Sequence, residues 1–196
     1  MGFVTRNTYY FDAPGAQNTP DAARFAVERA RELGVRKIVV ASTSGRTALA
    51  FRDAMVGTDL EMIVVTHAVG FSRPGEWEFS AETAEILRAG GAKIVTGTHA
   101  LSGLERAISR SPKLGGSSRT EAIAEALRRT VAVGLKVAVE CVLIAADQGA
   151  VGIDEEVIAA GGTATGADTV CVIRPAHTAA FFDLQVREIV AMPRDR

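Results

Sequence analysis

Strand-like apolar runs alternate along the chain with segments of helical periodicity, and this alternation constrains the fold more than any other feature. The runs are short and rich in valine and isoleucine, whereas the segments between them repeat their apolar residues every three or four positions. Parallel strands need a crossover helix between them, and such helices cover both faces of the sheet. The pattern therefore predicts an α/β fold, a three-layer α/β/α sandwich with a mostly parallel sheet.

Local signals set the expected bounds of the elements. Thr19, Ser80 and Ser118 are expected to cap helices, because a hydroxyl can accept a hydrogen bond from a free amide of the first turn. No helical segment separates the last three strands, so an antiparallel hairpin is expected at one edge of the sheet. Residues 1–196 are expected to form one domain. The predicted strands are 37–41, 62–66, 93–96, 157–160, 169–174 and 186–191, and the predicted helices are 20–33, 47–55, 81–89, 101–109, 119–131 and 135–147.

The segment 135–147 is apolar on nearly all sides, and its length favours a buried helix over a strand. As a helix it places Lys136, Glu140 and Asp147 on one narrow stripe. We interpret Lys136 and Glu140 as a paired polar stripe rather than as catalytic residues, although burial can perturb such a carboxylate.

Composition excludes several classes of protein. Twenty-two basic and 23 acidic residues give a net charge of −1, so there is no broad basic surface for nucleic acid or an anionic membrane. Aromatic residues make up 6% of the chain, too few for a stacking platform along a nucleic-acid strand. The two cysteines cannot form a CxxC motif, and no apolar run is long enough to span a membrane. We therefore expect a cytoplasmic protein without nucleic-acid or membrane partners.

The segment Ser42-Thr43-Ser44-Gly45-Arg46-Thr47 lies between a strong strand and a strong helix. The start of a helix has unpaired backbone amides and a partial positive charge, so it can bind an anion. The hydroxyl groups and Gly45 would let the chain close around a phosphate, and Arg46 could add a bidentate contact. The alternative is that Ser44 only caps the helix and Gly45 only makes the turn. The segment matches neither the GxxxxGK[ST] nor the GxGxxG motif.

The chain contains three histidines, His67, His99 and His177, and each follows a predicted strand within a few residues. In a parallel sheet His67 and His99 would lie at the same edge as the 42–47 loop, whereas the position of His177 depends on the direction of its strand. His67 and His99 are thus candidates for general acid–base catalysis or for contact with a ligand ring. The alternative is that each packs a loop. No HxH or HExxH spacing supports a metal site, and none is expected.

Several segments together resemble the C-terminal alpha/beta domain of pyruvate kinase, and more closely the stand-alone proteins that share this domain. The resemblance extends over nearly the whole chain. It is carried by PGAQNT (14–19), VVASTSGRTA (39–48), LSGLERAIS (101–109), GGTATGADT (161–169) and FFDLQVREIVAMPR (181–194).

The resemblance implies the pyruvate kinase C-terminal domain fold, with a phosphorylated ligand at the 42–47 loop. It does not imply kinase activity, because the catalytic barrel is absent. In pyruvate kinase a second effector loop carries Trp and Arg, but residues 162–168 contain neither, which favours a ligand with one phosphate. The stand-alone relatives are associated with flavin mononucleotide (FMN), which is the expected cofactor. The expected binding residues are Ser42, Thr43, Ser44, Gly45, Arg46, Thr47, Asn18, Thr66, His67, Gly97, Thr98, His99, Gly162 and Thr163.

Three functions follow from these observations. The first is binding of a phosphorylated small molecule, FMN above others, with the chain acting as a flavin-dependent enzyme of unknown reaction. The second is a non-catalytic metabolite sensor, by analogy with the allosteric role of the pyruvate kinase domain. The third is a lyase or hydrolase with His67 or His99 as its base. The apolar segment 3–11 and the C-terminal strand could supply a contact surface, so a homo-oligomer is also expected.

Overall fold

A computed structural model describes residues 2–195; residues 1 and 196, the two ends of the expected domain, lie outside that range. Seven strands form one sheet in the order β1-β7-β6-β5-β2-β3-β4. The strands are β1 (Tyr9–Phe11), β2 (Lys37–Ala41), β3 (Glu61–Thr66), β4 (Lys93–Thr96), β5 (Val157–Gly161), β6 (Thr169–Arg174) and β7 (Gln185–Pro193). The α-helices are α1 (Thr19–Leu33), α2 (Arg46–Ala54), α3 (Ala81–Ala89), α4 (Gly103–Ser109), α5 (Arg119–Thr130) and α6 (Val133–Asp147).

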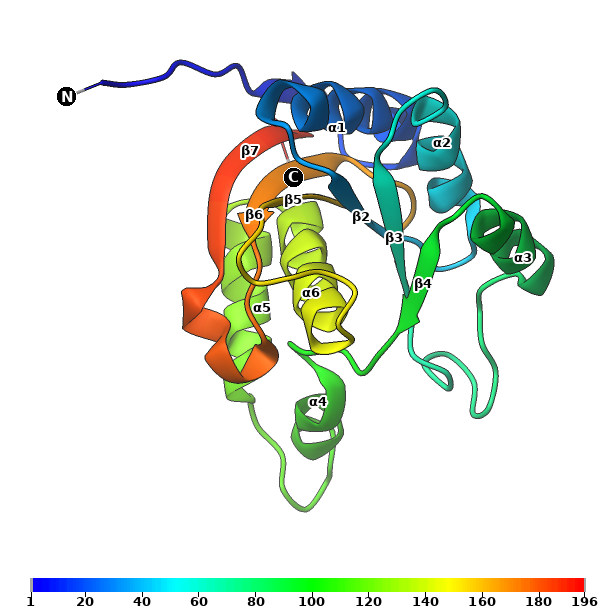
Figure 1. Cartoon of the computed structure of the whole chain (residues 1–196). Helices are drawn as coiled ribbons and strands as arrows, with labels where there is room; N and C mark the ends of the chain where they lie inside the picture. Colours follow the sequence, from blue (N-terminus) through cyan, green and yellow to red (C-terminus); the bar gives the residue numbers. More distant parts are fainter. Residues whose placement is uncertain (1, 196) are drawn as a thin grey trace.

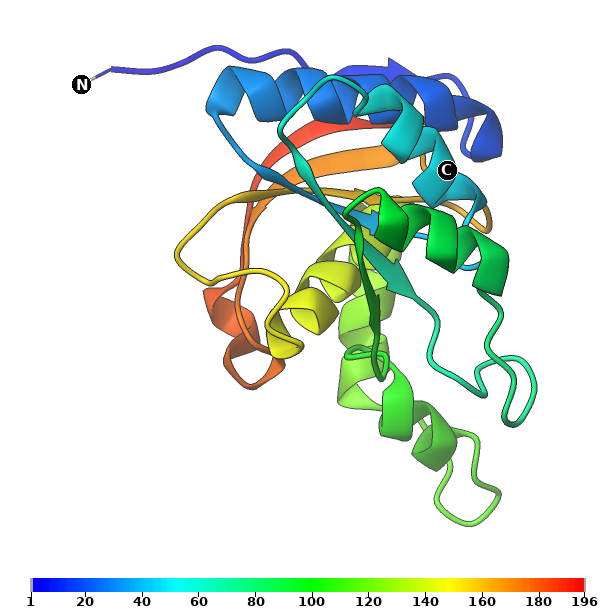
Figure 2. The same ribbon diagram turned by 45° about the vertical axis from the view of Figure 1, so that its right-hand side comes forward.

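Helices cover both faces of the sheet, as the alternating pattern predicts. Helices α1, α2 and α3 pack on one face, and α5 and α6 pack on the other (Figures 1 and 2). Successive residues of β2 point to opposite faces, so Ile38 and Val40 enter the core under α1 and α2 while Val39 enters the core under α6. The predicted three-layer α/β/α class is confirmed.

Strands β2, β3, β4 and β5 run in one direction. Strand β2 pairs in parallel with both β3 and β5, and β3 pairs in parallel with β4. Their carboxyl ends therefore meet at one edge of the sheet, which is where ligands bind in such folds. Strand β6 runs in the opposite direction, between β5 and β7.

The predicted antiparallel hairpin, β6–β7, forms, but it does not lie at the edge. Strand β1 pairs in parallel with β7 on the outer side, with Tyr9 opposite Ala191. The Tyr9 ring also stacks on Phe25 of α1, with ring centroids 3.9 Å apart. A three-residue strand is too short to show a period of two, so the sequence pattern alone predicts only an irregular start.

Helix α6 confirms the expectation of a buried helix in segment 135–147. Every residue from Gly134 to Ala146 except Val137 is buried.

Thr19, in contrast to the prediction, does not cap α1. The N-cap residue is Asn18, and the Thr19 hydroxyl instead accepts a hydrogen bond from the Ala167 amide at 3.0 Å. Thr19 thus ties the start of α1 to the loop after β5.

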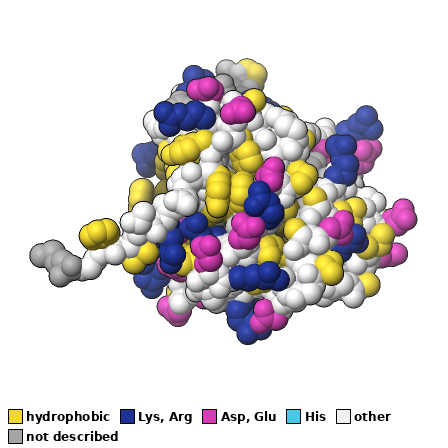
Figure 3. All heavy atoms as spheres, turned by 90° about the horizontal axis from the view of Figure 1, so that it is seen from above, with side chains coloured by type: hydrophobic (Ala, Val, Ile, Leu, Met, Phe, Trp, Pro, Cys, Tyr) yellow, Lys and Arg dark blue, Asp and Glu magenta, His cyan; other side chains and the backbone are white. Residues whose placement is uncertain are grey.

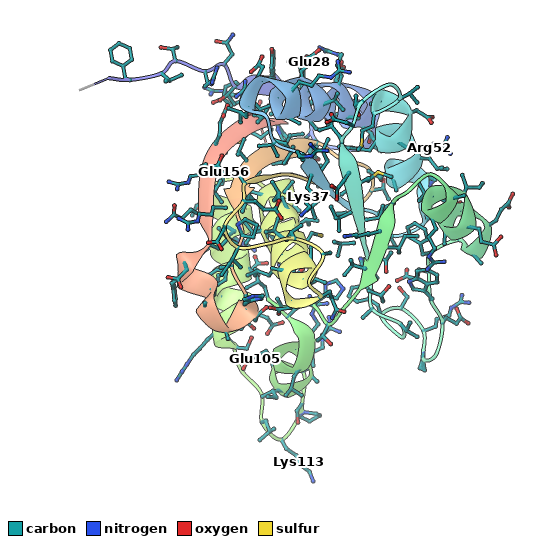
Figure 4. The ribbon with its side chains drawn as sticks, viewed as in Figure 1. Glu28, Lys37, Arg52, Glu105, Lys113 and Glu156 are labelled. Carbon is teal, nitrogen blue, oxygen red and sulfur yellow. The ribbon has the colours of Figure 1, made fainter. Side chains whose placement is uncertain are left out.

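The surface agrees with the small net charge. Seen from the side of α1, acidic and basic side chains are interspersed (Figure 3). Helix α4 and the loop after it project from the sandwich, and Figure 4 shows Glu105 on this helix and Lys113 at the tip of the loop. Among residues 2–195, no helix has both the length and the apolar character needed to cross a membrane.

Candidate functional site

A cavity of about 520 Å³ lies at the carboxyl edge of the parallel strands. It lies where the loops after β2, β3, β4 and β5 meet one face of α6, and the start of α1 and one residue each of α4 and α5 also reach it. The α6 face repeats with helical spacing. Its residues are Val133, Lys136, Val137, Glu140, Cys141 and Ile144.

The 42–47 loop forms one wall of this cavity. Gly45 has φ 100°, in the left-handed region, and a Cβ atom there would lie 2.5 Å from Cγ2 of Thr83. Only glycine avoids both the strained backbone and this contact, so Gly45 faces α3 rather than the cavity. The turn lets α2 begin at Arg46. The side chains of the loop that line the cavity are Ser42, Thr43, Ser44, Arg46 and Thr47.

The first turn of α2 has free donors. The Ser42 hydroxyl accepts from the Ala48 amide at 3.3 Å. Within residues 2–195, the amides of Arg46 and Thr47 donate to no backbone or side-chain acceptor. Unpaired amides at a helix start carry partial positive charge. The loop therefore does more than make a turn, because it leaves amides, hydroxyls and a guanidinium together beside a cavity.

His67 follows β3 and lies between the 42–47 loop and a carboxylate. Its Nδ1 is 2.9 Å from Oε2 of Glu78, and its Nε2 is 3.4 Å from Oγ1 of Thr43. The hydrogen bond from His67 holds the pKa of Glu78 below its usual value. The Phe71 ring packs on the imidazole, with centroids 4.0 Å apart.

His99 follows β4 and contacts a more deeply buried carboxylate. Its Nδ1 is 3.3 Å from Oε2 of Glu140, which also pairs with Lys136. The second Glu140 oxygen accepts from the Leu101 amide at 2.9 Å. We call His99, Lys136 and Glu140 the ionic cluster. The predicted Lys136–Glu140 pair is therefore confirmed. It lines the cavity, however, and is not merely a polar stripe on a buried helix.

Burial and charge oppose each other in the ionic cluster. Burial acts to raise the pKa of Glu140, but the hydrogen bond from His99 and the charge of Lys136 outweigh it and lower that pKa to about 2. Burial lowers the pKa of Lys136, and Glu140 opposes that shift. Burial also raises the pKa of the Cys141 thiol to about 12, so this lining cysteine is a poor nucleophile.

Two arginines that were not among the predicted binding residues line the cavity. They are Arg106 of α4 and Arg128 of α5. Arg106 belongs to a segment that carries the family resemblance, and this was the available signal. Nothing in the sequence around Arg128 distinguishes it from a solvent-facing helix residue.

The loop after β5 forms another wall of the cavity, through Gly162, Ala164, Thr165 and Gly166. Asp168 is fully buried, and its carboxylate accepts from the amides of Gly15 and Thr163 at 3.0 Å each. Asp168 therefore joins this loop to the segment before α1. Asn18 points elsewhere, because its side-chain amide donates to the Ala13 carbonyl at 2.7 Å.

The structure brings nine of the predicted binding residues to the cavity and leaves five outside its lining. Gly97 packs against Ile144, and Thr98 lines a separate cavity of about 290 Å³. His177 follows the antiparallel strand β6 and pairs with Asp147 at 3.4 Å outside the site. The nine are Ser42, Thr43, Ser44, Arg46, Thr47, Thr66, His67, His99 and Gly162, and the five are Gly45, Asn18, Gly97, Thr98 and Thr163. In residues 2–195, no group of three or more His, Cys, Asp and Glu side chains could hold a metal ion.

Among solved structures, a pyruvate kinase from Cryptosporidium parvum matches 81% of this chain and 23% of its own chain, with 16% identity and a TM-score of 0.43. A Cryptosporidium parvum pyruvate kinase in complex with ADP matches 85% of this chain and 25% of its own, with 16% identity and a TM-score of 0.43. A cystathionine beta-synthase from Bacillus anthracis matches 61% of this chain and 45% of its own, with 22% identity and a TM-score of 0.28.

The chain spans about a quarter of the length of these pyruvate kinases. All three TM-scores lie below 0.5, so the family assignment rests on a sequence model instead. The model of the pyruvate kinase alpha/beta domain matches residues 21–173, which include β2 to β5, all but the last residue of β6, and the 42–47 loop. Because this match covers well over half of the 196 residues, the chain belongs to the pyruvate kinase alpha/beta domain family.

Proposed function

We propose that this chain binds a phosphorylated small molecule, with its phosphate on the 42–47 loop and the rest of the ligand in the adjoining cavity. One observation carries the proposal: the hydroxyls of this loop, the Arg46 side chain and the start of α2 all lie at the same cavity. Hydroxyls, unpaired helix amides and a guanidinium are the donors that proteins use for phosphate.

The charge of the cavity lining supports an anionic ligand. Four cationic side chains and one carboxylate line it, although the whole chain has a net charge of −1. A cavity lined mainly by one sign of charge concentrates ligands of the opposite sign. The cationic residues are Arg46, Arg106, Arg128 and Lys136, and the carboxylate belongs to Glu140.

Among such ligands we propose FMN. The free donors of the 42–47 loop suit its single phosphate. The volume of about 520 Å³ falls in the range of about 300–1,000 Å³ that is usual for ligand pockets. Phe71, Val133 and Ile144 add apolar lining that suits a flat ring. When bound, FMN would supply electron and hydride transfer, and the residues of this chain would orient it and exclude water.

The test is titration of the purified protein with FMN and with riboflavin, followed by flavin fluorescence and calorimetry. We expect FMN to bind at least about tenfold more tightly than riboflavin, because one charge-assisted hydrogen bond contributes about 1.5–3 kcal/mol. Equal affinity for the two would contradict a phosphate site. No binding of either would reject FMN as the ligand.

Ser44→Asp separates binding from folding. A carboxylate at a helix start is favourable, so this variant should fold as well as the parent chain. The same carboxylate would repel a phosphate and should weaken FMN binding more than about tenfold. Ser117→Asp is the matched control, since Ser117 is exposed, precedes α5 and lies outside the cavity. FMN binding that survives Ser44→Asp would place the phosphate elsewhere.

Family membership favours a second candidate, a regulatory module that binds a phosphorylated metabolite without turning it over. A ligand that binds only the folded chain raises its melting temperature. A thermal-shift screen of phosphorylated metabolites would then show stabilisation by one of them and no product on incubation. If FMN stabilises the protein and is reduced by a hydride donor in its presence, the enzyme proposal is favoured over the sensor.

A further inference from the structure

His67 lies between the 42–47 loop and Glu78, and the proposed function does not yet assign it a role. Its Nε2 is 3.4 Å from the Thr43 hydroxyl, and its Nδ1 is 2.9 Å from the Glu78 carboxylate. The side chain is 30% exposed and lines the cavity. One imidazole nitrogen is therefore held by a carboxylate, while the other lies beside a hydroxyl of the proposed phosphate site.

A phosphate placed on this loop changes the electrostatics of that imidazole. A phosphate monoester carries a charge of about −1.5 to −2 at pH 7. A negative charge within about 4–6 Å favours the protonated form of a histidine, and a phosphate would add such a charge to that of Glu78. Histidine is also the side chain whose charge normally changes between pH 5 and 8. A phosphate bound beside Thr43 would therefore draw a proton onto His67.

We propose that His67 is a phosphate-binding residue that takes up a proton when the ligand binds, so that the site selects dianionic phosphate monoesters and binds them more tightly at about pH 6.5 than at about pH 7.5, a range in which the monoester is still mainly dianionic. This inference rests on the proposed function and adds a residue and a selection rule to it. Glu78 acts as a positioning residue, because it holds Nδ1 and directs Nε2 toward Thr43.

The groups that face His67 support this assignment. Glu78 is the charged group in direct contact, and Phe71 and Thr43 are uncharged. The His99 ring lies 5.3 Å away, and its own contact is the Glu140 carboxylate. The Arg106 guanidinium lies over the Phe71 ring, 6.0 Å from the ring centroid, and Arg46 and Lys136 also line the cavity. A positive charge on His67 would thus be balanced by Glu78 and the phosphate.

His177 provides a matched control within the same chain. It is also paired with a carboxylate, with 3.4 Å between its Nδ1 and Oδ1 of Asp147. It is 51% exposed and does not line the cavity. Replacing His177 therefore removes a histidine–carboxylate pair without touching the proposed phosphate site.

Isothermal titration calorimetry of FMN in two buffers of different ionisation enthalpy measures the protons taken up on binding. At pH 7.5 we expect uptake of about half to one proton per FMN for the parent chain and for His177→Gln. His67→Gln should reduce this uptake to near zero and weaken binding at pH 6.5 by about tenfold. Inorganic phosphate should also cause uptake, lowered by the protons that its monobasic fraction releases on binding, and riboflavin should cause none.

The outcomes separate the two proposals. If neither FMN nor inorganic phosphate binds, the proposed function fails and the role of His67 fails with it. If FMN binds tightly but without proton uptake, or if His67→Gln keeps the uptake, the proposed function stands and this inference is wrong. If His67→Gln does not fold, the His67 ring protons of the parent chain can be followed by NMR at pH 7.5. Their shift to the imidazolium position on addition of phosphate supports the inference, and an unchanged position overturns it.

Discussion

The two histidine–glutamate pairs at the edge of the sheet have the same chemistry and different surroundings. His67 and Glu78 both lie on loops and are 30% and 28% exposed, so water screens their charges. His99 and Glu140 are 16% and 6% exposed, and Glu140 lies on the buried helix α6. The comparison shows how burial decides what a polar pair can do.

The buried pair depends on further partners, and the exposed pair does not. Glu140 contacts Lys136, His99 and the Leu101 amide, because a carboxylate out of water must be paired and hydrogen-bonded. Glu78 can exchange its partner for water at little cost. We therefore expect the ionic cluster to hold the architecture of the cavity and the His67–Glu78 pair to respond to ligand and pH.

The largest expected effect comes from Glu140→Ala. The change leaves the Lys136 ammonium buried without its partner and the Leu101 amide without its acceptor. Breaking a buried ion pair costs about 3–5 kcal/mol of unfolding free energy. Urea denaturation followed by circular dichroism measures this loss. A loss below about 1 kcal/mol would mean that the ionic cluster is no more costly to break than the exposed pair.

The second largest effect is expected from acid, which should lower the free energy of unfolding that the ionic cluster contributes. The folded chain keeps Glu140 ionised down to about pH 2, whereas the ordinary pKa of this carboxyl is 4.5. Between these values the unfolded chain binds more protons, so the free energy of unfolding contributed by Glu140 falls as the pH falls. Unfolding free energies of the parent chain and Glu140→Gln should therefore converge between pH 4.5 and pH 2. Parallel curves would contradict the assignment.

A smaller effect is expected from the double variant Lys136→Met with Glu140→Gln. Both charges are removed together, and glutamine can still accept from the Leu101 amide. Because the desolvation cost of the charges disappears with them, the double variant should lose only about 1–2 kcal/mol. It should therefore be more stable than Glu140→Ala by denaturation. A loss that equals or exceeds that of the single variant would show that the charges themselves stabilise the fold.

The smallest stability effect is expected from Glu78→Gln. Pairs this exposed contribute about 0–1 kcal/mol, so the free energy of unfolding should hardly change. The ligand effect should be larger, because the glutamine cannot balance a charged imidazole. Calorimetry should show less proton uptake on FMN binding than in the parent chain. If unfolding changes by more than about 2 kcal/mol instead, the contrast between the two pairs is wrong.

Much of the fold followed from local patterns. The periodicity of 135–147 predicted a buried helix, and Ser80 and Ser118 cap α3 and α5 as expected. Strand β1 could not be predicted in the same way, because its pairing with β7 joins residues about 180 positions apart. Three residues carry too little pattern to reveal such a contact.

The residues of the candidate site also fall into two groups, those that local sequence patterns revealed and those that only tertiary contacts brought to the site. Ser42, Thr43, His67 and His99 were found from the sequence because each follows a strand within a few residues, and parallel strands end at one edge. Glu78 and Arg128 were missed, since they reach the site from a loop and from a helix end. Lys136 and Glu140 were recognised as a pair, but their place in the cavity depends on the face of α6 that packs there.

The sequence by itself determined the alternation of strands and helices along the chain from α1 onward, the buried helix and the hydroxyl-rich turn before α2, because these depend on neighbours within a few residues. Only the tertiary structure decided which carboxylate each histidine contacts, which arginines reach the cavity and which strand closes the sheet. Those contacts join residues far apart along the chain, and they form only when packing of the two cores has fixed the layers in place.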